Sequence, residues 1–182
     1  MKYFKKIIGS KVYLSPINPD DYEIYTKWLN DYSVSGNLTT FTSMISLSNE
    51  RAFLERLSSE GQNYAIVLSE NNTLIGSTSL MQIDYVHRTA TLGIYIGEAE
   101  NRGKGYGADA ICALVNYGFN SLNLHNIMLE VHSDNKQAID CYIKVGFHEF
   151  GRRSEAKYKN GKYIDFVYME ILDYEFRNKY SL

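Results

Sequence analysis

The sequence predicts an α+β protein in which helices flank a mixed, mostly antiparallel central sheet. Its 182 residues, 45% of them apolar, fit one domain that spans residues 1–182 and buries a core of its own. The hydrophobic period changes twice along the chain. Helical spacing comes first, residues 63–97 then alternate as strands do, and helical spacing returns after a glycine-rich stretch at 101–107.

Two helices are expected between an initial strand and the first hairpin. Asn18 is a predicted N-cap with Pro19 at the first helical position and acidic residues in the first turn, so a helix is expected over 19–31. Ser48 is the predicted cap of a second helix, and Gly61 is its stop signal.

The remaining elements follow from alternation, helical stripes and turn residues. The segments "YAIVLS" and "LIGSTSLMQI" predict a hairpin, and "TATLGIYIG" predicts a third antiparallel strand. A helical stripe runs from Ile111 to Leu122, "NIMLEVHS" predicts a strand, and a further helix ends at Gly146. The chain closes with "FHEFGRR" and "KYIDFVYMEIL", joined by Asn160-Gly161, which suits a type I′ turn.

Charge and composition exclude several classes of partner. The net charge is -2 and the basic residues are scattered, which argues against nucleic acid. Because no stretch approaches the ~18 apolar residues of a membrane span, no membrane partner is expected. The short apolar run after the first lysines does not fit a signal peptide. Cys112 and Cys141 lie in predicted helices without metal-type spacing, so a cytoplasmic protein with reduced thiols is expected.

The stretch "NRGKGYG", residues 101–107, has the composition of an anion-binding loop. A P-loop is excluded, because Gly105 stands where the motif needs Ser or Thr and Glu98 stands at the place of its first glycine. A dinucleotide fingerprint fits Gly103, Gly105 and Ala108, but it should follow the first strand of a parallel βαβ unit, whereas antiparallel hairpin strands precede it here.

The arrangement Arg102-x-x-Gly105-x-Gly107, between a strand and a long helix, resembles the pyrophosphate loop of the GCN5-related N-acetyltransferases (GNAT). Backbone amides and the helix N-terminus supply the positive field of such a loop. About 30 residues later, "NKQAIDCYIKVGF" is similar to a second signature of this family, through residues that share its spacing: Asn135, Ala138, Ile139, Tyr142, Gly146 and Phe147. The C-terminal part resembles the branch of ribosomal-protein alanine, spermidine and amino-sugar N-acetyltransferases.

The resemblance implies a GNAT-like fold, acetyl-CoA as cosubstrate and a set of residues that contact it. The loop would hold the pyrophosphate, Asn135 the pantetheine or phosphate arm, and the strand end its thioester portion. The implied contact residues are Tyr95, Ile96, Gly97, Arg102, Gly103, Lys104, Gly105, Tyr106, Gly107 and Asn135. Tyr142 is the candidate acid that protonates the departing thiolate, and helical spacing places it on the same face as Asn135.

A base must take the proton of the amine, because an amine with a pKa of ~10.4 is almost wholly protonated at neutral pH. Glu130 is the candidate, since strand alternation places it and His132 on the face opposite Leu129 and Val131. Glu98, just before the loop, is the alternative, and either carboxylate is able to act through water.

Several features remain open at the level of sequence. The acceptor is expected to be a ribosomal-protein N-terminus, a polyamine, an amino sugar or an aminoglycoside. Trp28, Tyr32 or Phe41 are candidates to line its cleft. His87 and His125 lack ligand partners at suitable spacing, so no metal is expected. The family branch implies a homodimer. A catalytically inactive sensor that binds the coenzyme is the alternative function.

Overall fold

The computed structural model describes residues 2–38 and 43–181. The chain divides into two compact units. The first consists of Met1–Ser79 and Ile94–Ala113, and the second of Leu80–Gly93 and Leu114–Leu182. Phe41, a predicted cleft residue, lies outside the described residues.

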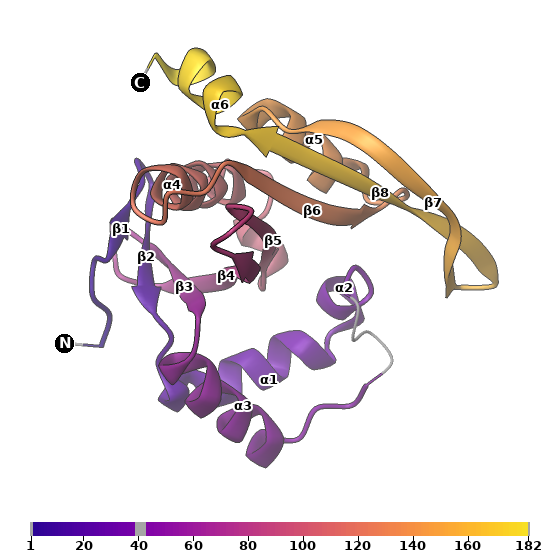
Figure 1. Cartoon of the computed structure of the whole chain (residues 1–182). Coiled ribbons are helices and arrows are strands. Elements are labelled where there is room, and N and C mark those ends of the chain that lie inside the picture. Colours follow the sequence, from indigo (N-terminus) through magenta and orange to yellow (C-terminus); the bar gives the residue numbers. More distant parts are fainter. Residues whose placement is uncertain (1, 39–42, 182) are drawn as a thin grey trace. The chain divides into compact units, whose positions relative to one another are not determined.

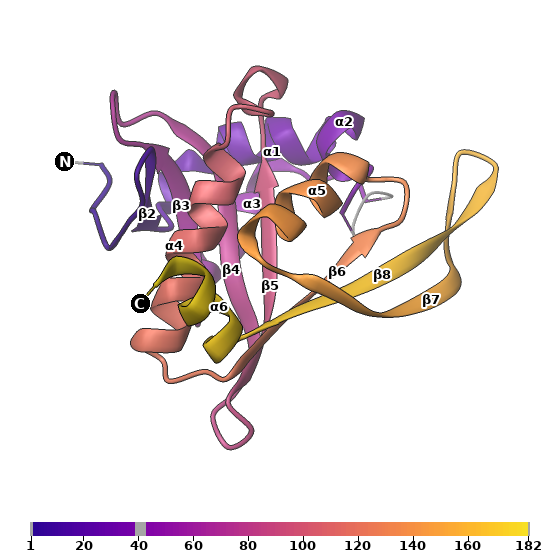
Figure 2. The ribbon, with the colours of Figure 1, turned by 90° about the horizontal axis from the view of Figure 1, so that it is seen from above.

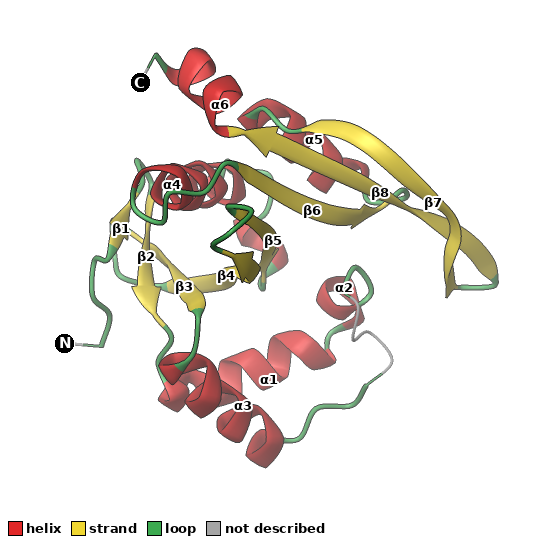
Figure 3. Cartoon of the chain, in the orientation of Figure 1, coloured by secondary structure: helices red, strands yellow, loops and turns green. Residues whose placement is uncertain are grey.

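The first unit contains the N-terminal strands and a layer of helices (Figures 1 and 3). Its elements are β1 (Ile7–Ile8), β2 (Val12–Pro16), the 3-10 turn η1 (Pro19–Asp21), α1 (Tyr22–Asn30), α2 (Tyr32–Ser35), α3 (Leu47–Ser59), β3 (Gln62–Leu68) and η2 (Ala99–Asn101). β4 (Leu74–Asp84), β5 (Thr89–Ile96) and α4 (Tyr106–Asn120) each have residues in both units.

The second unit contains the C-terminal strands and two more helices. Its elements are β6 (Asn126–His132), α5 (Lys136–Val145), β7 (His148–Lys159), β8 (Lys162–Leu172) and α6 (Asp173–Tyr180). Figure 2 shows β7 and β8 as one long, twisted hairpin. Two register shifts interrupt their pairing, as expected where bulges increase the twist of a ribbon.

The strands of the described residues form one sheet in the order β1-β2-β3-β4-β5-β6-β8-β7. β2 pairs antiparallel with β1 and β3, and β8 pairs antiparallel with β6 and β7. β5 pairs parallel with β6, joining Thr89–Thr91 to Asn126–Met128. This ladder ends at Thr91, although both strands run on. The predicted mixed, mostly antiparallel sheet is confirmed.

The core of the first unit lies between its helices and its strands. Tyr25 and Trp28 of α1 and Leu54 of α3 pack against Tyr13 of β2 and Val67 of β3, and each side chain is buried. Burying a side chain of this size contributes roughly 1.5–3 kcal/mol, so these contacts hold α1 and α3 against the strands.

Turn and cap residues explain most element boundaries. The Asn18 side chain accepts a hydrogen bond from the Asp20 amide, but the first turn after it is 3-10 and α1 begins only at Tyr22. The predicted cap of α3 at Ser48 is wrong, because Ser46 accepts from the Asn49 amide and the helix begins at Leu47. Asn160 and Gly161 both have positive φ, 51° and 80°, which confirms the predicted turn.

Four short or polar elements were not predicted: β1, α2, η2 and α6. Among the described residues, no helix combines the length and the apolar character needed to cross a membrane.

Candidate active site

The glycine-rich loop contains two residues in the left-handed region of backbone conformation. Gly103 and Gly105 have positive φ, 74° and 84°, which glycine adopts without steric cost. α4 begins at Tyr106, directly after the second of them, and Gly107 lies in its first turn. Because the first amides of a helix lack intrahelical partners, the loop and the start of α4 have the donors that an anion such as pyrophosphate requires.

Asp109 fixes the start of α4 to the turn between β1 and β2. Its carboxylate accepts hydrogen bonds from the backbone amides of Ser10, Lys11 and Val12 at 2.9, 2.7 and 2.9 Å. The Lys11 ammonium donates to the carbonyl of Lys104 at 3.0 Å, which brings a positive charge to the loop. Neither side chain was predicted from the sequence. The position of Asp109 in the first helical turn after a glycine loop is a sequence signal that could have identified it. No sequence signal identifies Lys11.

Arg102 connects the loop to the end of β5. Its guanidinium donates to the carbonyls of Ile96 and Gly97 at 3.2 and 2.7 Å, and to Ser33 of α2 at 3.3 and 3.4 Å. The Gly97 amide donates to the carbonyl of Ile75 at 2.9 Å. The predicted contact residues Tyr95–Gly97 and 102–107 are therefore held together in the first unit, with several of their backbone groups engaged by the protein.

Gly97 lies against the ring of Trp28. A Cβ at Gly97 would come within 2.1 Å of the indole, so only glycine fits there. Trp28 is 1% exposed and makes edge contacts with Tyr25 and Tyr95, with ring centroids 5.5 and 6.4 Å apart. Trp28 is thus a core residue rather than an exposed cleft residue, whereas Tyr32 on α2 is exposed.

Glu98 is engaged in hydrogen bonds that favour its ionised form. Oε1 accepts from Lys27 Nζ at 2.6 Å and from Trp28 Nε1 at 3.0 Å. The Lys27 hydrogen bond, followed by that of Trp28, lowers the pKa of Glu98. A carboxylate with a lowered pKa is a weaker base at neutral pH, so this environment disfavours the alternative base.

Tyr142 and Asn135 belong to α5 of the second unit. Asn135 is the N-cap and its side chain accepts from the Ala138 amide at 3.2 Å, while Gly146 ends the helix with a φ of 125°. Tyr142 is buried and meets Phe147 edge-on at 5.9 Å. Burial, followed by the nearby Cys141, raises its pKa, so the phenol keeps its proton at neutral pH.

Glu130 and His132 lie on β6 of the same unit in different surroundings. Glu130 is exposed and is paired across the ladder with Tyr168. His132 is buried, stacks on Phe166 at 5.2 Å and approaches Lys157 Nζ with Nε2 at 3.2 Å. Burial, then the charge of Lys157, lowers the pKa of His132 to about 4, so its imidazole is neutral.

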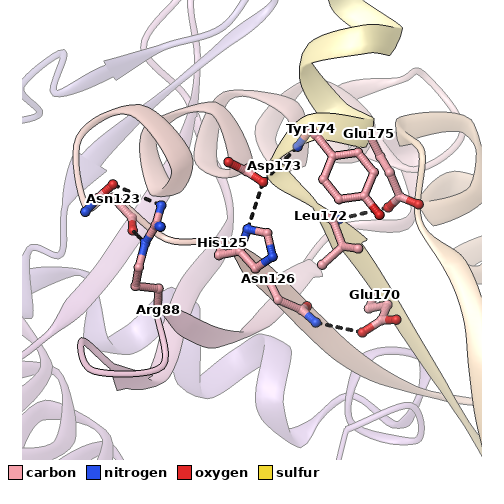
Figure 4. Close-up of polar contacts among 9 residues, drawn as sticks. All are labelled: Arg88, Asn123, His125, Asn126, Glu170, Leu172, Asp173, Tyr174 and Glu175. Carbon is pink, nitrogen blue, oxygen red and sulfur yellow. Dashed lines mark hydrogen bonds and ion pairs between the residues drawn. The ribbon is translucent and has the colours of Figure 1, made fainter.

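His125, directly before the first residue of β6, lies among polar side chains (Figure 4). His125 Nδ1 lies 2.9 Å from the Asp173 carboxylate at the start of α6, and Asn126 donates to Glu170 of β8 at 2.7 Å. His87 lies in a turn, where its amide donates to Asp84 at 2.8 Å. Within the described part of the chain, no three His, Cys, Asp or Glu side chains are grouped to hold a metal ion.

Comparisons with known proteins relate the whole arrangement to one family. Residues 11–148 match the sequence profile described as the acetyltransferase (GNAT) domain. A spermidine N(1)-acetyltransferase from Vibrio cholerae serotype O1 is 33% identical over 130 residues, which cover 71% of this chain and 75% of that protein.

Two solved structures have the same fold. A spermidine N-acetyltransferase from Vibrio cholerae in complex with CoA and spermine superposes with a TM-score of 0.80 at 27% identity, over 91% of this chain and 98% of that one. A GNAT-family acetyltransferase from Bacillus anthracis gives a TM-score of 0.82 at 21% identity, over 93% and 99% of the two chains. The second likeness concerns the fold alone, and together they confirm the predicted fold class.

Proposed function

Because this chain belongs to the GNAT family of N-acetyltransferases, we propose that it transfers acetyl from acetyl-CoA to a primary amine by direct attack in a ternary complex. The single observation that carries this proposal is the loop at 102–107, whose two left-handed glycines precede the N-terminus of α4. A solved relative in complex with CoA supports the choice of cosubstrate.

Each unit contains residues that we propose to contact acetyl-CoA. In the first, the loop Arg102–Gly107 binds the pyrophosphate through its amides, with Lys11 adding charge, and Tyr95–Gly97 bind the thioester end. The guanidinium of Arg102 is engaged with the carbonyls of Ile96 and Gly97, so its role is to hold the strand end. In the second, Asn135 contacts the pantetheine or phosphate arm.

The proposed chemistry requires one proton acceptor and one proton donor. Transfer forms the bond between the amine nitrogen and the acetyl carbon, breaks the carbon–sulfur bond, and moves a proton to the departing sulfur. Tyr142 is the proposed donor, since burial keeps its phenol protonated. Glu130 is the proposed acceptor, and its exposed position suits proton transfer through water.

The acceptor we propose is a polyamine, which is supported by the similarity to spermidine acetyltransferases. A peptide N-terminus and an amino sugar are the competing acceptors. We further propose that residues 1–182 work as one catalytic domain in the cytoplasm and assemble as a homodimer. Light scattering coupled to size exclusion measures the assembly, and a monomeric mass at working concentration contradicts the last of these points.

Two measurements test the function. Calorimetric titration with CoA should give a binding heat, and release of free thiol from acetyl-CoA should depend on an added amine. Spermidine, a tripeptide and glucosamine serve as the acceptor panel. CoA binding without thiol release in the presence of any of these amines would indicate the catalytically inactive sensor. The absence of a binding heat would contradict both the transferase and the sensor.

Replacing Tyr142 by phenylalanine tests the proposed acid. Loss of a general acid typically costs ~10²-fold or more in rate, so kcat should fall by that order while CoA affinity stays within a factor of two or so. Tyr85→Phe, at an exposed position in the turn after β4, is the matched control. Equal kcat values for the two variants would rule out the role of Tyr142.

A further inference from the structure

His132 is a buried histidine on β6 whose ring the proposed reaction does not use. It is 4% exposed, and its ring stacks on that of Phe166 on β8 with an angle of 4° between the two planes. Nε2 lies 3.2 Å from the amine nitrogen of Lys157 on β7. Nδ1 is buried and has no hydrogen-bond partner among the described residues. Lys157 therefore supplies the polar contact of this buried ring.

A bulge in the hairpin of β7 and β8 brings Lys157 to the ring. From Arg153 to Lys157, β7 advances four residues, while its partner β8 advances two, from Phe166 to Ile164. Glu155, inside this segment, has a positive φ of 50°. A bulge bends a strand and redirects its side chains. Since β8 lies between β7 and β6 in the sheet, the side chain of Lys157 crosses β8 to reach the ring on β6.

The unpartnered Nδ1 indicates which form of the amine suits this contact. The ring is neutral, because burial and then the charge of Lys157 lower the pKa of His132 to about 4. If Lys157 is an ammonium, it donates to Nε2, and the ring proton must lie on Nδ1 as a buried N–H without an acceptor, which is rare in proteins. If Lys157 is a neutral amine, it accepts from Nε2–H, and Nδ1 carries no proton. The contact therefore favours the neutral amine.

Burial and the surrounding charges favour the same form. Burial, followed by the charge of Lys159, lowers the pKa of Lys157. The carboxylates of Asp134 and Glu130 act in the opposite direction, but Asp134 is itself paired with Lys159 at 3.0 Å. A desolvated lysine beside a second ammonium is an activated nucleophile. Because Lys157 is only half-buried, a reagent is able to reach its nitrogen.

We propose that Lys157 is a modification site at which the protein accepts an acetyl group from a thioester on its own side chain. The amine nitrogen attacks the carbonyl carbon of the thioester, the carbon–nitrogen bond forms and the carbon–sulfur bond breaks. The thiolate leaves with the electron pair of that bond and takes up the proton that the nitrogen loses. The products are an acetylated Lys157 and a free thiol. The inference rests on the proposed function for its donor, acetyl-CoA, and adds an acceptor within the chain.

Mass spectrometry after incubation with deuterated acetyl-CoA at pH 8 tests the site. Lys162, an exposed lysine of the same hairpin, is the internal control. Lys157 should be acetylated about 10-fold faster than Lys162, because each unit by which a pKa falls raises the neutral fraction of the amine about tenfold. Lys157→Arg should remove most of the label from the intact protein, whereas Lys162→Arg should leave it unchanged.

A second variant tests the electrostatic reason for the reactivity. Asp134→Asn removes a carboxylate that raises the pKa of Lys157 and releases Lys159 from its ion pair. Both changes favour the neutral amine, so acetylation of Lys157 should become roughly threefold faster or more. Asp140→Asn, at an exposed position on α5, is the matched control and should leave the rate unchanged. Equal rates in the two variants would contradict the proposal.

A small thioester separates failure of this inference from failure of the proposed function. S-acetyl-N-acetylcysteamine carries the same acetyl thioester as acetyl-CoA but no nucleotide, so its reaction with Lys157 does not require the loop at 102–107. Equal acetylation of Lys157 and Lys162 by either donor would overturn the proposal, even where added amines release thiol from acetyl-CoA. Preferential acetylation of Lys157 by the small thioester supports the proposal, and it does so even where no binding of CoA is found, a result that contradicts the proposed function alone.

Discussion

Replacing Asp109 by alanine is expected to weaken the connection between the start of α4 and the β1–β2 turn. Three backbone amides lose their acceptor, at distances of 2.7 to 2.9 Å. Hydrogen bonds to a charged group contribute ~1.5–3 kcal/mol each, and water replaces part of this at the two exposed amides. The free energy of unfolding should therefore fall by about 2–4 kcal/mol.

Urea unfolding followed by circular dichroism measures this change, and the melting temperature should fall by roughly 5–15 °C. Asp140→Ala, at an exposed position on α5, is the control. Gly9→Ala approaches the same contact from the other side, because a Cβ there would lie 2.5 Å from Asp109 Oδ2. If Asp109→Ala stays within about 0.5 kcal/mol of the control, the three hydrogen bonds do not hold this turn.

Three other perturbations address buried groups. Gly97→Ala should lower the free energy of unfolding by about 1–3 kcal/mol, because its Cβ would overlap the Trp28 ring. Gly151→Ala is the control, since a Cβ there meets nothing within 4 Å. Equal unfolding midpoints of the two variants would show that the ring moves aside. Burial raises the pKa of Glu50 from 4.5 to about 7, so between these values the folded state holds a proton that the unfolded state releases. The free energy of unfolding should therefore decrease as pH rises from 4.5 to 7. The same dependence of stability on pH in Glu50→Gln would contradict this. His132, with a pKa lowered from 6.5 to about 4, should make stability increase as pH rises from 4 to 6.5; an imidazole titration near 6.5 by NMR would refute its burial.

Local chemistry explains why much of the fold was predictable. Gly146 and Asn160-Gly161 adopt positive φ, which few other residues tolerate, so their positions mark a helix end and a hairpin turn. Gly103 and Gly105 do the same for the loop before α4. Such backbone requirements are set by single residues and therefore appear in the sequence.

The errors arise where neighbouring signals compete or where packing decides. Ser46 and Ser48 are both able to cap a helix, and the choice of Ser46 depends on which hydroxyl reaches a free amide, that of Asn49. α6 was missed because it is polar, and of its residues only Phe176 is buried. Hydrophobic periodicity does not reveal the contacts that fix its start. One of them is the hydrogen bond that the Leu172 amide donates to the Glu175 carboxylate.

Site residues whose environment is set by nearby positions in the chain could be predicted from the sequence, whereas those with distant partners could not. The loop at 102–107 was found from its own glycines, two of which adopt positive φ, and its role in binding stays a prediction. The partners of Glu98 are Lys27 and Trp28, about 70 positions earlier in the chain, and no periodicity reveals them. The roles of Tyr142 and Glu130 stay predictions, because they depend on bound substrates.

The acidic side chains show why residue type alone does not assign chemistry. Asp109 accepts hydrogen bonds from three amides, and Glu98 accepts from an ammonium and an indole, so both hold backbone or side chains in place. Glu130 faces solvent, where a base is able to exchange protons with water. Glu50 alone of these four is buried without such partners among the described residues, and burial therefore raises its pKa to about 7.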